Sequence, residues 1–301
     1  GHTGYGAATA TAVITGDLLD AMRAALAFIA PHLLGKNMLD FNTLLRSIHQ
    51  SIVHHDSLKA ALEIALFDLR AQLVGLPLYQ LLGGGEPVIK TDITISVNDT
   101  DIMVADARRA VAEGFDCLKI KLGGHTWRDD VLSVAAISRA VGPHVALRLD
   151  ANQGWNYIDA LRALQGLKDL NIEHCEEPVQ AGNIVDQARL TALSPMPIMA
   201  DESVFNHKDA YKVLSQQAAH MINIKLGKTG GICNGMKLAG LAEAADVYCQ
   251  VGSFSESKVG MSALLHFSMA WDNIIHHDMD SPLMHSEDPV TGGLTYHKDW
   301  E

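Results

Sequence analysis

The sequence has no long apolar run and no closely spaced cysteine pair, and each absence excludes a class of protein. No stretch of about 18 or more apolar residues occurs, so no membrane-spanning helix is expected. The N-terminal residues GHTGYGAATA lack the charged and apolar regions of a signal peptide. The cysteines form no CxxC pair, which is typical of buried thiols in a reducing compartment: Cys117, Cys175, Cys233 and Cys249.

Basic residues are also few compared with acidic residues. The chain has 23 Lys and Arg residues against 35 Asp and Glu, a formal net charge of −12. This balance argues against the basic face that binds nucleic-acid phosphates. Hydrophobic residues make up 48% of the 301 residues, enough to bury a large core. Together these properties predict a cytoplasmic protein that acts on a small molecule, with neither nucleic acid nor membrane as a partner.

The first part of the chain is predicted to be helical. Residues 57–75 place apolar side chains on one helical stripe: Leu62, Ala65, Leu66, Leu69 and Leu73. Asp56 or Ser57 is expected to cap the start of this helix, and Gly75 to end it. Glycine and proline residues then interrupt the pattern over residues 75–87.

From Val88 onward, short runs rich in strand-forming residues alternate with helix-like stretches. The eight runs are residues 91–97, 117–123, 144–152, 172–178, 197–203, 221–227, 247–253 and 274–280. Most of these runs end in a polar residue. The intervals between successive polar residues are close to the length of a βα unit, about 30 residues. Eight such units predict an α/β fold, a TIM-like (β/α)8 barrel with catalytic residues at the C-terminal ends of the strands. A doubly wound sheet is the alternative, but its site lies at one switch point.

Three carboxylates, Asp150, Glu176 and Asp201, end consecutive predicted strands. Converging inside a barrel, they would repel one another and could not all stay ionised without a cation. Oxygen ligands without His or Cys favour Mg²⁺, with Mn²⁺ as a substitute. The alternative is that each carboxylate caps a separate helix in its βα loop.

Three lysines form the second candidate set: Lys119 and Lys121 in CLKIKLGG, and Lys225. The second and sixth strands of such a barrel face each other, so Lys121 and Lys225 could approach a bound molecule from opposite sides. Two bases on opposite faces of one carbon are what a racemase or epimerase needs. Lys119 would lower the pKa of Lys121 by like-charge repulsion. A solvated edge strand is the alternative for this alternating stretch.

The segment HHDMDSP contributes Asp278 and Asp280, two residues apart and hence on one face. They could hold a substrate ammonium group, or could form only an acidic turn. His276 with Asp278 could suggest a zinc hydrolase, but the first strand offers no partner histidine pair. KLGKTGG is not a P-loop, because Ile222 stands where the Walker pattern needs glycine.

In combination, KIK, RLDANQGW, CEEPV, MADES, INIKLGKTGGI and DMD resemble the enolase superfamily, muconate-lactonizing-enzyme subgroup, and within it the dipeptide epimerases. The resemblance implies that Asp150, Glu176 and Asp201 bind Mg²⁺. It implies that Lys121 and Lys225 are the acid/base pair and Lys119 a modulator of Lys121. It further implies that a few residues contact the substrate: Asp278 and Asp280 at the α-ammonium, and Ser253 and Ser255.

The activity implied by the resemblance is that of an isomerase. A Mg²⁺-dependent enzyme would epimerise a dipeptide at the Cα next to its C-terminal carboxylate, by two-lysine 1,1-proton transfer through an enolate. L-Ala-D/L-Glu or a related dipeptide is the default substrate, and a homo-oligomer is expected. The alternatives are an N-acylamino acid racemase, a muconate-type cycloisomerase, an o-succinylbenzoate synthase, or a metal-binding barrel without catalysis.

The chain departs from the family pattern in two places. Glu177 stands where the family has Gln after the metal-binding glutamate of the fourth strand. Residues 1–85 are interpreted as the remnant of an α+β capping domain whose N-terminal strands and mobile loop are truncated, with part of its C-terminal segment also missing. Residues 86–301 are interpreted as the barrel domain with the active site.

Overall fold

The computed structural model describes residues 1–85 and 89–297. At its centre lies one eight-stranded sheet in which sequential strands are neighbours and pair in parallel. The sheet curls until the backbone N–H of Asp92, just before β1, donates to the carbonyl of His277 at the end of β8. The strands are β1 (Ile93–Ile95), β2 (Cys117–Lys121), β3 (Ala146–Asp150), β4 (Ile172–Glu176), β5 (Ile198–Ala200), β6 (Met221–Ile224), β7 (Tyr248–Val251) and β8 (Ile274–His277).

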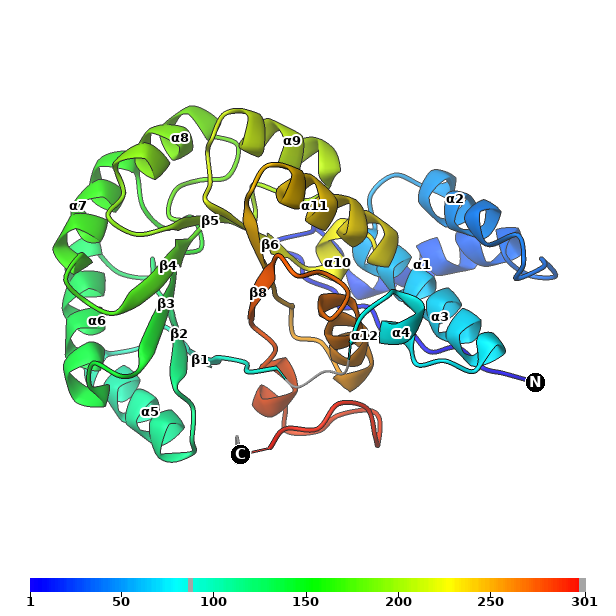
Figure 1. The fold of residues 1–301 in the computed structure, drawn as a ribbon, viewed down its shortest axis with the longest axis horizontal. Coiled ribbons are helices and arrows are strands. Elements are labelled where there is room, and N and C mark those ends of the chain that lie inside the picture. The colour runs from blue at the N-terminus through cyan, green and yellow to red at the C-terminus, as the bar shows by residue number, and fades with distance from the viewer. Residues whose placement is uncertain (86–88, 298–301) are drawn as a thin grey trace.

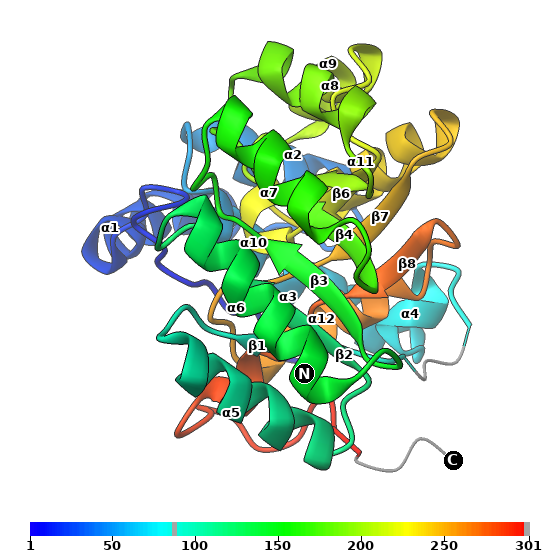
Figure 2. The same ribbon diagram turned by 90° about the vertical axis from the view of Figure 1, so that its left-hand side faces the viewer.

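Helices connect the strands and cover the outside of the curled sheet (Figure 1). In the order of the chain they are α5 (Thr100–Ala112), α6 (Trp127–Val141), α7 (Tyr157–Leu167), α8 (Ile184–Leu193), α9 (His207–Ser215), α10 (Leu226–Thr229), α11 (Ile232–Ala244) and α12 (Lys258–Ser268), with a 3-10 turn η2 (Ser281–Met284) after β8. Figure 2 shows α5, α6 and α7 side by side in front of β2, β3 and β4. The predicted (β/α)8 fold is confirmed, and each of the eight predicted runs contains a strand.

The side chains of strand β2 alternate between the helices outside the barrel and the inside of the barrel. Leu118 and Ile120 are fully buried in a core cluster that includes residues of α5 and α6. The intervening Lys119 contacts carboxylates from β3 and β4, so the lysine face is turned to the inside of the barrel. The edge-strand alternative is wrong, because β2 pairs with β1 on one side and with β3 on the other.

The N-terminal residues form a helical group beside α10, α11 and α12 (Figure 1). It contains α1 (Leu19–Ile29), the 3-10 turn η1 (Ala30–His32), α2 (Phe41–Ser51), α3 (Asp56–Val74) and α4 (Leu78–Leu81). Helix α3 ends at Gly75 in the left-handed conformation, as predicted. Its start differs from the prediction, because His55 occupies the cap position and no side chain caps the helix.

The buried face of α3 also differs from the predicted leucine stripe. Its buried side chains include Ala60, Glu63, Ile64 and Phe67, whereas Leu73 is 54% exposed. The reason is Glu63, which is fully buried and accepts hydrogen bonds from His49 of α2, over 2.7 Å, and from the backbone N–H of Cys233 in α11. The carboxylate of Glu63 lies at the positive N-terminal end of α11, where a negative charge is favourable. Its polar contacts explain why this acidic residue is on the buried face of α3.

The change of texture at Val88 and the start of the proposed barrel domain at residue 86 lie outside the described residues. Among the helices that the structure describes, none is both long and apolar enough to cross a membrane.

Candidate active site

The three predicted metal ligands lie at the same end of the sheet. Asp150 and Glu176 are the last residues of β3 and β4 and are paired in the sheet register, and Asp201 directly follows β5. Parallel strands end at one edge, so their terminal side chains meet. All three are buried, with at most 1% of the residue exposed. As isolated helix caps they would not converge in this way, and in the described structure the helices after β3 and β4 are capped instead by Asn156 and Asn183.

Lys119 lies at the centre of this group. Its Nζ is 3.1 Å from Asp150 Oδ2, 2.8 Å from Glu176 Oε2 and 2.7 Å from an oxygen of Asp278. Burial alone would lower the pKa of Lys119, but the charges of Asp278, Glu176 and Asp150 together raise it well above its usual range. Lys119 is therefore a fixed buried cation among carboxylates.

The two candidate bases reach the carboxylates from different strands. Lys121, the last residue of β2, places its Nζ 2.6 Å from Asp150 Oδ2 and 3.0 Å from Asn152 Oδ1. Lys225, directly after β6, places its Nζ 2.7 Å from Asp201 Oδ2. The two lysines thus flank the carboxylate group at its β3 side and its β5 side.

The three carboxylates differ in the direction of their pKa shifts. Burial would raise the pKa of Asp150 and of Asp201, but the neighbouring lysine charges hold both below the usual range. Burial and the adjacent Asp150 raise the pKa of Glu176 to about 7. Asn223 of β6 supports Glu176 by donating to its Oε1 over 2.7 Å.

The predicted substrate-binding residues are dispersed over the same end of the barrel. Asp278 is paired with Lys119, and Asp280 accepts a hydrogen bond from the backbone N–H of Thr94 over 2.6 Å. Burial and the charge of Asp278 raise the pKa of Asp280 to about 6. Ser253 is half-buried after β7, whereas Ser255 is exposed and accepts a hydrogen bond at its carbonyl from Thr9 in the N-terminal segment.

Lys228 is a site residue that the sequence reasoning missed. It is 1% exposed, and its Nζ lies 2.6 Å from Asp201 Oδ1 and 3.0 Å from the carbonyl of Asn223. The short helix α10 begins directly after Lys225 and turns Lys228 back toward the strand ends. The signal in the sequence was the spacing of the two lysines, three residues apart, which one helical turn brings to the same side.

Glu177 follows Glu176 but is directed away from the lysines. Its Oε2 accepts hydrogen bonds from the backbone N–H groups of Asp201, over 2.6 Å, and Ser203, over 3.2 Å. Burial raises its pKa to about 8. Glu177 therefore orders the loop after β5, which carries Asp201.

The donor set fits a Mg²⁺ ion. Asp150, Glu176 and Asp201 offer only carboxylate oxygens, the ligand type that Mg²⁺ prefers. Their oxygens are contacted in this structure by the ammonium groups of Lys119, Lys121 and Lys225. A divalent cation would supply positive charge at the same oxygens.

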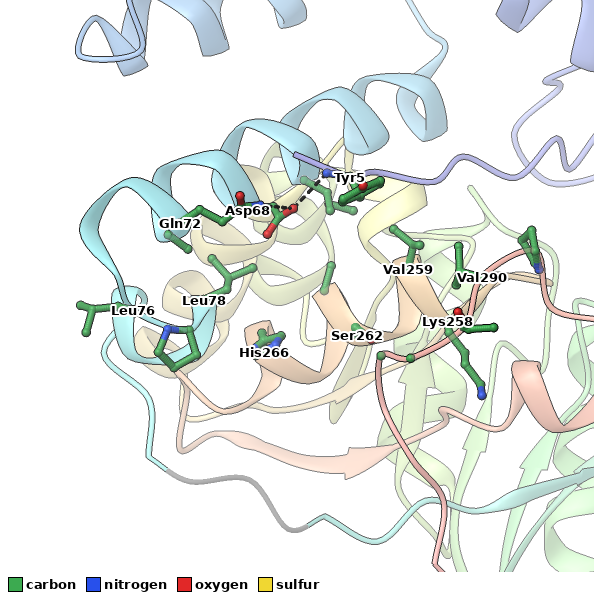
Figure 3. Close-up of a pocket in the computed structure, with 18 residues that line it drawn as sticks. Tyr5, Asp68, Gln72, Leu76, Leu78, Lys258, Val259, Ser262, His266 and Val290 are labelled. Carbon is green, nitrogen blue, oxygen red and sulfur yellow. Dashed lines mark hydrogen bonds between the residues drawn. The ribbon is translucent and has the colours of Figure 1, made fainter. Parts of the chain in front are cut away.

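A separate pocket of about 820 Å³ lies outside the barrel, between α3, α4, α12 and residues 289–293 (Figure 3). Its lining includes Asp68, His266 and Lys258, and none of the predicted site residues. The candidate active site is therefore the carboxylate and lysine group, and the outer pocket is distinct from it.

Comparisons with known proteins identify the family of the chain. The family described as "Enolase C-terminal domain-like" matches residues 102–299, and "Mandelate racemase / muconate lactonizing enzyme, N-terminal domain" matches residues 1–83. The N-terminal domain of the family is thus represented in the chain. L-Ala-D/L-Glu epimerase of Bacillus subtilis is 43% identical over 98% of this chain and 82% of its own length.

Solved structures of dipeptide epimerases share the fold. A substrate-liganded complex of the Bacillus subtilis enzyme has a TM-score of 0.96, with 98% of this chain and 83% of that chain covered. The enzyme from Cytophaga hutchinsonii, complexed with Mg and the dipeptide D-Ala-L-Val, is 38% identical with a TM-score of 0.96 and covers 99% of this chain and 81% of its own. The chain belongs to the mandelate racemase/muconate lactonizing enzyme family of the enolase superfamily.

Proposed function

We propose that this chain is a Mg²⁺-dependent dipeptide epimerase, an isomerase that inverts the Cα next to the C-terminal carboxylate of a dipeptide. The observation that carries the proposal is the placement of Lys121 and Lys225 on two sides of a buried carboxylate trio. A dipeptide such as L-Ala-D/L-Glu is the default substrate, by likeness to the relatives.

Asp150, Glu176 and Asp201 would hold the Mg²⁺ ion. When bound, the ion supplies positive charge that stabilises a substrate carboxylate and makes the neighbouring Cα–H more acidic. One of Lys121 and Lys225 removes that proton, and the other returns a proton to the opposite face. Lys119, held by carboxylates, keeps a fixed positive charge near Lys121.

Asp278 and Asp280 would bind the α-ammonium group of the dipeptide. Both are buried: Asp278 is paired with Lys119, and Asp280 accepts a hydrogen bond from the backbone N–H of Thr94 in β1. Asp278→Asn with Asp280→Asn should raise KM for the dipeptide and leave Mg²⁺ affinity unchanged. An unchanged KM would contradict the ammonium role.

Proton exchange in D₂O tests the two-lysine scheme. Lys121→Ala and Lys225→Ala should each abolish epimerisation, because one face of Cα loses its base. Each variant should still exchange the Cα proton of a single epimer, and the two variants should differ in which epimer. Lys212→Ala, at an exposed lysine of α9, is the control and should retain full activity.

Complete epimerisation by either Lys121→Ala or Lys225→Ala would rule out the scheme. An N-acylamino acid racemase is the competing function, and it should prefer the same dipeptide with its amino group blocked. Faster turnover of the blocked form would therefore replace the dipeptide assignment.

We also propose a substitute metal, domain limits, a compartment and an oligomeric state for this protein. Mn²⁺ is proposed as a substitute metal, on the basis of the oxygen donor set. Residues 1–85 and 86–301 are proposed as the capping and barrel domains. The protein is proposed to act in the cytoplasm as a homo-oligomer, and its four cysteines, all free thiols, support the first of these.

A further inference from the structure

A second group of ligand-type side chains lies in the barrel, nearer the N-terminal ends of the strands than the carboxylate trio. It consists of Glu173 and His174 of β4 and His276 of β8. Their ligand atoms all lie within 4.8 Å of one another. None of these residues takes part in the proposed epimerisation.

A β-bulge makes this arrangement possible. In the pairing of β3 with β4, Leu147 pairs with Ile172 but Arg148 pairs with His174, so Glu173 is an extra residue. Adjacent strand residues normally point to opposite faces, and a bulge re-aims one of them. A similar shift in β8, where Ile275 is the extra residue, precedes His276.

His174 is the residue that points to a ligand. It is fully buried, and neither of its ring nitrogens has a hydrogen-bond partner among the residues that the structure describes. A buried polar group without a partner destabilises the folded state. An imidazole nitrogen with a free lone pair is also the commonest side-chain ligand of transition metals.

Arg148 holds the other two members of the group. Its Nη2 lies 2.6 Å from His276 Nδ1, and its Nε lies 2.7 Å from Glu173 Oε2. Its Nη1 also donates to Asp92 Oδ2 over 3.0 Å, and the second oxygen of that buried carboxylate has no partner among the described residues. Asp92 can therefore keep the guanidinium paired when Glu173 and His276 turn to a cation.

We propose that Glu173, His174 and His276 form a binding site for a transition-metal ion of the Zn²⁺ type. Two imidazoles and one carboxylate, with a water molecule in the fourth position, are a known tetrahedral zinc set. This donor set differs from the all-carboxylate trio, so the two sites select different metals. The side chains of Glu173 and His276 are 33% and 15% exposed, which gives the ion a path of entry.

The ion would connect β4 to β8, two strands that are not neighbours in the sheet. Binding to the folded chain alone raises stability by linkage. The thermal midpoint should therefore increase with Zn²⁺ concentration, independently of any effect of Mg²⁺ on activity.

Co²⁺ is the direct probe, because tetrahedral Co²⁺ absorbs visible light far more strongly than octahedral Co²⁺. The full chain, freed of metal with a chelator, is titrated with Co²⁺ in a large excess of Mg²⁺. We expect one equivalent to bind with the strong tetrahedral spectrum. Failure to retain Co²⁺ under excess Mg²⁺, or a weak octahedral spectrum, would overturn the proposal without any variant.

Variants assign the bound ion to its ligands. His174→Gln and His276→Gln should each weaken Co²⁺ binding strongly. The loss should exceed about 10–100-fold, which is typical when only an outer-shell partner of a metal ligand is removed. His277→Gln, at the adjacent histidine outside the group, and Asp150→Asn, in the carboxylate trio, should both retain the ion. Circular dichroism checks that each variant is folded. Equal binding by folded His174→Gln, or loss of binding in Asp150→Asn, would place the ion elsewhere.

Discussion

Glu256, a few residues beyond the end of β7, is a carboxyl group whose titration should be visible in the stability of the protein. Burial raises its pKa from 4.5 to about 7. The folded state thus favours the protonated form, and this contribution is complete below pH 4.5 and lost as the pH rises to about 7. The whole contribution is about 3 kcal/mol.

The variant Glu256→Gln stays neutral at every pH and isolates this effect. Its free energy of unfolding, relative to the unmodified chain, should increase between pH 4.5 and about 7 and then stay constant. Urea unfolding at a series of pH values measures the difference. A difference that does not change with pH would show that Glu256 titrates normally in the folded protein.

Lys228 should be needed for stability as well as for the geometry of Asp201. Lys228→Met would leave the buried Asp201 with one cation fewer, and removal of one partner of a buried ion pair typically costs about 3–5 kcal/mol. Lys237→Met, at an exposed lysine of α11, is the control and should change stability little. Equal urea midpoints for the two variants would contradict the role assigned to Lys228.

At the scale of elements, the loops after β2 and β3 are in direct backbone contact. A Cβ on Gly154 would lie 2.4 Å from Gly123 Cα and 2.9 Å from the carbonyl oxygen of Ala151. A side chain at Gly154 would force the two loops apart, and these loops directly follow the strand ends that carry Lys121 and Asp150. Close contact between two glycines thus sets the distance between a candidate base and a candidate metal ligand.

Gly154→Ala should therefore reduce both stability and activity. Overpacking of this kind costs about 1–3 kcal/mol, and displacement of Lys121 relative to Asp150 should lower kcat. Gly166→Ala within α7 is the matched control, because its Cβ would meet only a side chain at 3.4 Å and alanine favours helix. Thermal unfolding and epimerase assays on both variants make the comparison, and similar losses in both would contradict the argument.

For individual strands and helices, some features were predictable from the sequence and others were not. The alternation of Leu118 and Ile120 with lysines predicted a strand with an apolar and a lysine face, because side chains alternate strictly along a strand. It left open whether the lysine face points into the barrel or into water. The same reasoning failed for α3, where the buried Glu63 is fixed by contacts with α2 and α11. The bulge at Glu173 was also beyond prediction, since an extra residue in a strand is defined only by its pairing partner.

At the scale of the whole molecule, Mg²⁺ should stabilise the barrel by joining three strands. Asp150, Glu176 and Asp201 come from the ends of β3, β4 and β5, so an ion held by all three binds only the folded chain. Differential scanning fluorimetry should show a thermal midpoint that increases with Mg²⁺. Asp201→Asn should lose most of the increase, whereas Asp272→Asn, at an exposed carboxylate, should keep it.

A Mg²⁺-dependent increase that persists in Asp201→Asn would place the ion outside the trio. At this scale the sequence predicted the strand order and the gathering of the carboxylates and lysines at one end of the barrel, because both follow from regular spacing along the chain. It did not predict which carboxylate contacts which lysine, because those pairings depend on side chains that meet only in the closed barrel.

The lysine contacts bear on how tightly the carboxylate trio can hold a cation. Lys121 and Lys225 are each bound to a carboxylate of the trio, at 2.6 and 2.7 Å. A cation held by Asp150 and Asp201 would compete with Lys121 and Lys225 for these oxygens. The affinity of the trio for a cation is therefore linked to the strength of the two lysine contacts, and a substitution that strengthens either contact should weaken cation binding.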